Sequence, residues 1–300
     1  MFDNPARDGV TDTKFLRLLE VASNSGTYYF TENQLYFEYC KRILKGHKVA
    51  AIVAGSFLIV TAVLFLIGGE HEPEWLGVAV WFAAAATVIA GVTAISRWSR
   101  RNDSRSRFDG ILTRWRKAGD GKSLDFLLDT PRLGDPPPSW PERDIYDYGV
   151  ERIIVVERDL MVDLFVLNGL HTQERALVVS ETGYPSYLWP KAKEMIAANP
   201  AIPVILLHDS TAAGLDMAQR VARLDLGASA VKDVGIFPDD IKQLKRLTPT
   251  NPARSGFAVA LDLLPYAMMA TGISAAIVSA STMGEVLGKT DPNTRESDFG

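Results

Sequence analysis

The sequence has few of the residues from which disulfides and zinc sites are built. Cys40 is the only cysteine among 300 residues, which excludes an internal disulfide and a zinc site with several cysteine ligands. The four histidines show no HExxH or other metal-ligand spacing: His47, His71, His171 and His208. A formal net charge of −4 also argues against a globally basic protein that coats nucleic acid. A disulfide scaffold and a zinc hydrolase are therefore excluded.

Charged residues are missing from two long stretches, 49–68 and 75–96, which a short acidic turn separates. At about 1.5 Å per helical residue, each stretch is long enough to cross a hydrocarbon core of roughly 30 Å. A buried helical hairpin in a soluble core would need a much larger protein around it, because both stretches are apolar on every side. We predict a transmembrane hairpin over residues 49–96, with the lipid bilayer as its partner.

Positive charge lies on both outer flanks of this hairpin and is missing from the turn within it. Basic residues precede the first stretch and follow the second: Lys41, Arg42, Lys45, Lys48, Arg97, Arg100, Arg101, Arg105 and Arg107. Such residues are retained on the cytoplasmic side of a membrane. We therefore expect a multi-pass protein of the inner membrane with both chain ends in the cytoplasm. Small residues four apart, Ala83, Thr87 and Gly91, allow close helix packing, either within the hairpin or in a homo-oligomer.

The segments around the hairpin are expected to be helical. Residues 1–48 carry amphipathic helices, the second of which opens with a capping box of Thr31 and Gln34. Residues 97–145 begin with a juxtamembrane helix that has Phe108 and Trp115 on its apolar side. They end in the proline-rich stretch 129–143, the clearest domain boundary in the chain.

A different pattern follows this boundary. Short apolar runs rich in β-branched residues alternate with helical stretches, the runs being 152–156, 176–179, 203–207 and 229–234 and the helices 160–170, 185–198 and 212–224. This alternation predicts βαβ units and a parallel sheet covered on both faces. The predicted fold class is thus a membrane-anchored α/β protein, with a Rossmann-like cytoplasmic domain over residues 146–250.

Polar residues follow three of the predicted strands: Glu157 and Asp159, then Ser180 to Gly183, then His208 to Thr211. Parallel sheets carry their functional groups beyond the carboxyl ends of the strands. These residues are therefore the candidate site. The simpler interpretation is that Asp209 caps the helix beginning near Ala212, while Glu157 is a solvated side chain. His208 is either a strand-end side chain or a general base.

Residues 148–247 resemble the Toprim domain of topoisomerases and primases, closest to the version in the archaeal topoisomerase VI A subunit and its meiotic relatives. The motifs that carry the likeness are IIVVERDLMVDLF, LVVSETGYPS, ILLHDSTAAG and VKDVGIFPDDI. They cover about a third of the chain. In that family a Glu and paired Asp residues hold Mg²⁺, so the resemblance implies Glu157 and Asp209 as ligands, followed by the turn glycine Gly214.

The resemblance is incomplete at the third ligand. Thr211, a neutral hydroxyl, stands where the family has a carboxylate, and losing an anionic ligand weakens a Mg²⁺ site. Asp159 or Asp163 could supply the missing carboxylate. The family's tyrosine nucleophile belongs to a separate winged-helix domain, which residues 9–129 do not provide. A degenerate site is therefore expected.

The last region, 251–300, contains an apolar stretch from 257 to 286 that Asp262 and Pro265 interrupt. It is either a third membrane crossing or a helical pair packed on the sheet or on the membrane face, followed by a disordered tail.

Three functions remain open from the sequence. The first is an inner-membrane protein with a non-catalytic Toprim-like sensing or binding domain, working with a protein partner in a multi-gene system such as defence, and with nucleic acid or nucleotide as further partners. The second is a two-span membrane effector similar to SLATT-type elements. The third is a membrane-tethered, Mg²⁺-dependent nuclease that uses Glu157 and Asp209 as catalytic and metal-binding residues.

Overall fold

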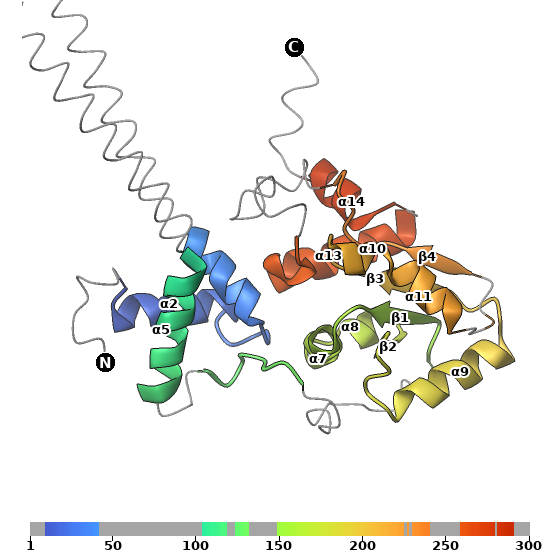
Figure 1. The fold of residues 1–300 in the computed structure, drawn as a ribbon, viewed down its shortest axis with the longest axis horizontal. Helices are drawn as coiled ribbons and strands as arrows, with labels where there is room; N and C mark the ends of the chain where they lie inside the picture. The colour runs from blue at the N-terminus through green and yellow to red at the C-terminus, as the bar shows by residue number, and fades with distance from the viewer. Residues whose placement is uncertain are drawn as a thin grey trace, which may run out of the picture. The chain divides into compact units, whose positions relative to one another are not determined.

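A computed structural model describes residues 10–41, 104–118, 124–131, 149–224, 227, 230–240, 259–279 and 281–290 (Figure 1). The chain divides into two compact units. The first comprises residues 1–12 and 38–120, and the second comprises residues 13–37 and 121–300. The candidate site lies entirely in the second unit.

A four-stranded parallel sheet forms the centre of the second unit. Its strands are β1 (Arg152–Val156), β2 (Ala176–Ser180), β3 (Val204–Leu207) and β4 (Val231–Asp233), in the order β2-β1-β3-β4. β1 pairs with β2 on one side and β3 on the other, so Ile153 faces both Leu177 and Val204. β2 and β3 are buried throughout because their residues are almost all apolar. The predicted parallel sheet is confirmed.

Five helices accompany the strands, and two of the predicted helical stretches are divided. They are α7 (Asp159–Leu167), α8 (Leu170–Gln173), α9 (Leu188–Ala198), α10 (Ala212–Leu215) and α11 (Met217–Arg223). α7 and α8 separate at Gly169, whose φ of 79° is left-handed. α10 and α11 separate at Asp216. α7 packs on β1 and β2, and its residues 160–166 are buried.

The C-terminal region forms the helical pair that was one of the two expectations for residues 257–286. A short 3₁₀ turn, η3 (Leu261–Leu263), precedes α13 (Tyr266–Ser279) and α14 (Met283–Thr290), which pack together. α13 has 14 residues, fewer than the roughly 20 needed to cross a bilayer. It buries Met269 and Ile273. Among the described residues of this stretch, no helix is long enough for a third crossing.

The N-terminal part of the second unit joins the α/β part through short contacts. It contains most of α2 (Asp12–Ala22), a turn, and the start of a helix over residues 32–41. Phe30 forms an isolated parallel bridge with Leu127. The predicted capping box is confirmed: the Thr31 amide donates to Gln34 Oε1 (3.0 Å), and the Gln34 amide donates to Thr31 Oγ1 (3.2 Å).

The first unit contains α5 (Ser104–Ala118), which buries Phe108, Ile111, Leu112 and Trp115, the apolar face expected from the sequence. The ring centroids of Tyr39 and Phe108 are 5.4 Å apart.

The structure corrects the prediction of a membrane-anchored fold. Within the described part of the chain, no helix has both the length and the apolar character that a membrane crossing requires. We therefore correct the fold class to α/β with a parallel sheet and withdraw the multi-pass, inner-membrane location. Residues 49–96, with the proposed contact at Ala83, Thr87 and Gly91, lie outside the described residues.

Candidate functional site

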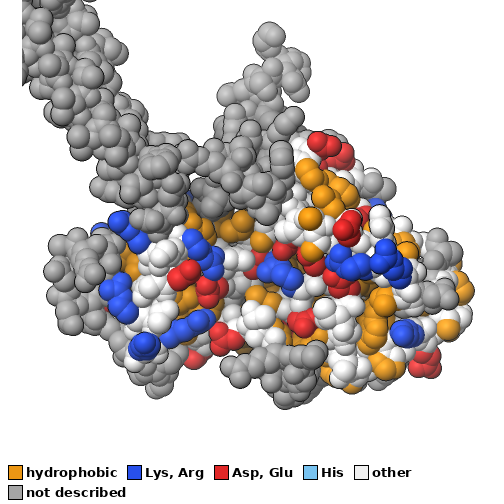
Figure 2. All heavy atoms as spheres, viewed as in Figure 1, with side chains coloured by type: hydrophobic (Ala, Val, Ile, Leu, Met, Phe, Trp, Pro, Cys, Tyr) orange, Lys and Arg blue, Asp and Glu red, His pale blue; other side chains and the backbone are white. Residues whose placement is uncertain are grey.

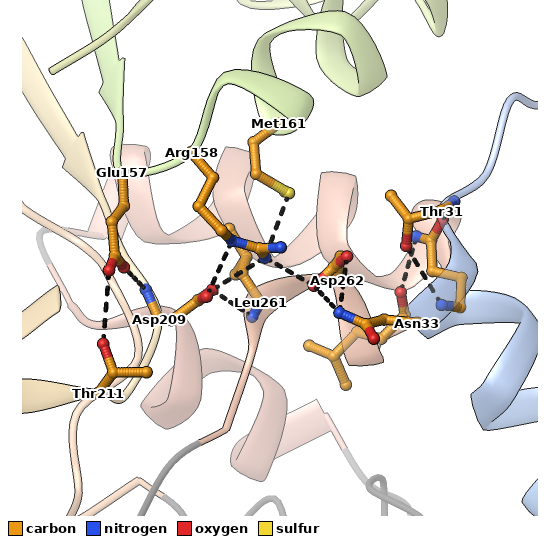
Figure 3. Close-up of polar contacts among 11 residues, drawn as sticks. Thr31, Asn33, Glu157, Arg158, Met161, Asp209, Thr211, Leu261 and Asp262 are labelled. Atoms are coloured by element: carbon orange, nitrogen blue, oxygen red, sulfur yellow. Dashed lines mark hydrogen bonds and ion pairs between the residues drawn. The ribbon is translucent and has the colours of Figure 1, made fainter. Parts of the chain in front are cut away.

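Three of the predicted candidate residues, Glu157, Asp209 and Thr211, meet at the carboxyl ends of β1 and β3. Glu157 and Arg158 follow β1, whereas Asp209 and Thr211 follow β3 (Figure 3). The Asp209 amide donates to Glu157 Oε2 (2.9 Å), and Thr211 Oγ1 donates to Glu157 Oε1 (3.4 Å). Glu157 therefore links the two strand ends through a backbone amide and a hydroxyl.

Thr211 caps α10. Its Oγ1 accepts the Gly214 amide (2.8 Å), and its backbone is extended, as an N-cap requires. The expectation that Asp209 would be the cap is thus wrong. Gly214 is needed because a Cβ there would overlap the Asp209 carbonyl and approach Glu157 Oε2 to 2.9 Å. The tight turn after β3 therefore depends on Thr211 and on a glycine at 214.

The carboxylate of Asp209 is held by Arg158 and by the backbone of Leu261. Asp209 Oδ2 lies 3.0 Å from Arg158 Nε, and Oδ1 accepts the Leu261 amide at 2.6 Å and Arg158 Nη2 at 3.2 Å. Asp209 is only 6% exposed. Burial raises its pKa to about 6, although the charge of Arg158 opposes this. Oδ1 therefore accepts two hydrogen bonds, while Oδ2 forms an ion pair with the guanidinium.

Asp262 is the second carboxylate that contacts Arg158. From the sequence, neither Arg158 nor Asp262 is identified as a site residue, and the two are not paired. Arg158 Nη2 donates to Asp262 Oδ1 at 2.6 Å, and Asn33 Nδ2 lies 3.1 and 3.2 Å from the two oxygens (Figure 3). Asp262 is fully buried. Burial would raise its pKa, but the charge and hydrogen bond of Arg158 outweigh burial and hold the pKa below its usual value.

Arg158 is thus the centre of the site. Burial alone would lower the pKa of its guanidinium, but the charges of Asp262 and Asp209 outweigh burial and raise it. Its Nη2 also contacts Met161 Sδ at 3.7 Å. The guanidinium supplies one positive charge between two buried carboxylates, which is the place a cation would take in a metal site.

Asp159 and Asp163 belong to a separate polar group beside β2. Thr182 Oγ1 donates to Asp159 Oδ1 at 2.5 Å, and Tyr184 Oη donates to the buried Asp163 Oδ1 at 2.8 Å. Burial raises the pKa of Asp163 to about 7, against the hydrogen bond from Tyr184. The structure therefore directs both carboxylates toward the loop after β2 and gives neither a contact with Asp209.

His208 has both ring nitrogens engaged. Nδ1 lies 2.8 Å from the Asp209 carbonyl, and Nε2 lies 3.0 Å from Asp233 Oδ1. Burial alone would lower the pKa of His208, but the bonds to Asp233 and the Asp209 carbonyl outweigh burial and raise the pKa. Nδ1 makes a hydrogen bond with the Asp209 carbonyl, whereas Nε2 makes a charge contact with Asp233. Its partners favour the strand-end interpretation over a general base.

Glu181, from the loop after β2, pairs with Arg220 of α11. Arg220 Nε and Nη2 lie 3.0 and 2.6 Å from the two carboxylate oxygens. This bidentate pair fastens α11 to the strand end. It leaves Glu181 with a structural partner.

These residues, as arranged, do not fit a Mg²⁺ ion. Mg²⁺ favours about six oxygen ligands in octahedral geometry, but Asp209 Oδ1 accepts the Leu261 amide and the guanidinium of Arg158 lies 3.0 Å from Oδ2. A search of the described residues for three or more His, Cys, Asp or Glu side chains grouped around one ion site finds none. The chemistry available at this edge is charge pairing.

Comparison with family models, with curated proteins and with solved structures gave no match for this chain. The Toprim resemblance therefore stays a prediction from four sequence motifs, and the function must be argued from the geometry.

Proposed function

We propose that the α/β part of this chain is a non-catalytic binding or sensing domain, Toprim-like in its motifs, in which Arg158 replaces the metal. The observation that carries the proposal is the guanidinium of Arg158 between Asp209 and Asp262, 3.0 and 2.6 Å away. A divalent ion at Asp209 would have to displace this cation or lie beside it. Either costs Coulomb energy in a buried setting.

The rest of the site supports the same proposal. The hydroxyl of Thr211, the third position of the motif, accepts the Gly214 amide and caps α10. Glu157 is used to hold the turn after β3. Catalysis requires groups that remain available to a substrate, whereas these groups satisfy one another. The arrangement fits a domain that changes between bound and unbound states without turning over a substrate.

The face shown in Figure 2 also favours a partner other than a long nucleic acid. On the face shown in Figure 2, basic and acidic side chains of the described residues are intermixed. Binding to a phosphate backbone depends on a clustered basic surface. A protein or small ligand, as part of a multi-component system, is the partner class that we propose.

Mg²⁺-dependent DNA cleavage is the test. The 300-residue chain is incubated with supercoiled plasmid and millimolar Mg²⁺, and its melting temperature is measured with and without the ion. We expect no cleavage and no rise in melting temperature, since a ligand that binds only the folded state would raise it.

The matched variants are Glu157→Gln and Asp209→Asn, with Arg175→Met as the control for a surface change. Cleavage by the native chain that both carboxylate variants lose and the control keeps would overturn the proposal. It would establish the nuclease instead.

A further inference from the structure

A short segment, residues 259–264, lies against the strand-end site; we call it the C-terminal strap. Ser210 and Val259 form an antiparallel bridge, with the Ser210 amide donating to the Val259 carbonyl at 2.9 Å. The Leu261 amide donates to Asp209 Oδ1, and Asp262 pairs with Arg158. The strap is therefore bound to the site by both backbone and charge.

The opposite side of the strap contacts the N-terminal segment. Asn33 Nδ2 donates to Asp262, and Gln34 Nε2 donates to the Leu264 carbonyl at 2.9 Å. Beyond the strap, the rings of Tyr28 and Tyr266 have centroids 4.9 Å apart. Asp262 thus touches two segments that are far apart in sequence, each through a buried or half-buried polar contact.

Gln34 performs two tasks at once. Its Oε1 accepts the Thr31 amide in the capping box, while its Nε2 holds Leu264 of the strap. Gln34 is buried, so its side chain cannot exchange either partner for bulk water at low cost. A displacement of the strap would therefore also disturb the first turn of the helix over residues 32–41.

We propose that the C-terminal strap couples the strand-end site to the start of this helix, so that loss of the Arg158–Asp262 pair loosens the capping box of Thr31 and Gln34. Asp262 is the coupling group because it is fully buried and shared between Arg158 and Asn33. Without Arg158, its charge lacks a buried cation, and the strap must shift to hydrate it. The inference deepens the proposed sensing role and rests on it.

Coupling of this kind is reciprocal. A substitution at Arg158 must change amide protection at the start of the helix, and a substitution at Asn33 must change amide protection beside Asp209. Two sets of amides report these two places: the Thr31 and Gln34 amides in the capping box, and the Leu261 amide on Asp209. They belong to different segments, so each can respond alone.

Amide hydrogen exchange of the whole chain tests the proposal. In Arg158→Met we expect exchange at Thr31 and Gln34 to rise by about tenfold or more beyond any rise at the β1 amides, which report global opening. In Asn33→Ala we expect the Leu261 amide to rise in the same way. Arg158→Lys, which keeps a cation, should restore part of the protection at Thr31 and Gln34.

Lys232→Met is the matched control. Lys232 Nζ donates to the Ala276 and Ile277 carbonyls at 2.9 and 2.8 Å, a polar link between β4 and α13 that bypasses the strap. The Lys232→Met substitution should leave the Thr31 and Gln34 amides protected from exchange. The proposal is overturned if the exchange rates of the reporter amides change only as much as those of the β1 amides in every variant. It is also overturned if Lys232→Met raises exchange at Thr31 and Gln34 as Arg158→Met does. Should Arg158→Met not fold, Asn33→Ala decides alone. The cleavage test measures a different quantity, so the coupling proposal and the proposed function can each be overturned while the other stands.

Discussion

Replacing Arg158 by methionine removes the only cation that Asp262 contacts among the described residues. Methionine keeps an unbranched chain of similar reach, so the change acts on charge and hydrogen bonding. Asp262 is fully buried and Asp209 is 6% exposed. Breaking a buried pair from one side leaves an uncompensated charge, which typically costs about 3–5 kcal/mol. Because two carboxylates lose the same cation, we expect the free energy of unfolding of this unit to fall by that amount.

The assay is hydrogen exchange at the β1 amides Ile153 to Val156, which become exchangeable when the unit opens globally. A loss of about 3–5 kcal/mol corresponds to a rise of roughly 10² to 4 × 10³ in their exchange rates, at about 1.4 kcal/mol for each factor of ten. Arg175→Met is the control because Arg175 and its partner Glu151 are 55% and 48% exposed. An exposed pair contributes about 0–1 kcal/mol.

The double variant Arg158→Met/Asp262→Leu separates charge from packing. Replacing a buried ion pair by apolar residues is often neutral or stabilising, so the double variant should recover at least about half of the loss. If Arg158→Met lowers the free energy of unfolding no more than Arg175→Met does, the assignment of Arg158 as the cation that stabilises two buried carboxylates is refuted. If the double variant loses more free energy of unfolding than the two single variants together, the unpaired charge is not the cause of the loss in Arg158→Met.

Three further predictions concern neighbouring residues. Asp163→Asn keeps an acceptor for Tyr184 but cannot ionise. In the native chain the pKa of Asp163 is raised from 3.8 to about 7. The stabilisation from protonated Asp163 is therefore complete below pH 3.8 and is lost as the pH rises through 7. The variant should therefore gain stability over the native chain at pH 9, by at most about 4 kcal/mol, and show no gain at pH 4, measured by urea unfolding. Gly214→Ala should cost about 2 kcal/mol or more, because its Cβ meets the Asp209 backbone, whereas Gly110→Ala, with open space around it, should gain up to about 1 kcal/mol. Thr211→Ala should lose about 1 kcal/mol of α10 capping that Thr211→Ser retains, and equal losses in both would contradict the cap.

Much of the α/β part could be predicted from local patterns. β1 to β4 follow runs of apolar, β-branched residues, and their polar neighbours Glu157 and Asp209 were placed correctly at one edge. The capping box of Thr31 and Gln34 was visible because its partners are three residues apart. These features depend on residues close in sequence, which is why the sequence shows them.

The centre of the site could not be predicted in the same way. Arg158 and Asp262 are 104 positions apart, and no local spacing marks them as partners. A signal did exist: Asp262 interrupts an apolar stretch, and a buried carboxylate needs a cation or several donors. The prediction of a membrane anchor rested on apolar length alone, and the described residues contain no helix that supports it.

The central claim is that Arg158 takes the place of a metal ion. It is tested most directly by crystals of the native chain and of Arg158→Met grown with millimolar Mn²⁺, which binds oxygen ligands as Mg²⁺ does and gives an anomalous signal. We expect no anomalous peak at Asp209 in the native chain, where the guanidinium lies 3.0 Å from Oδ2. A peak bridging Glu157 and Asp209 in the native chain, with Arg158 displaced from Asp262, would contradict the account.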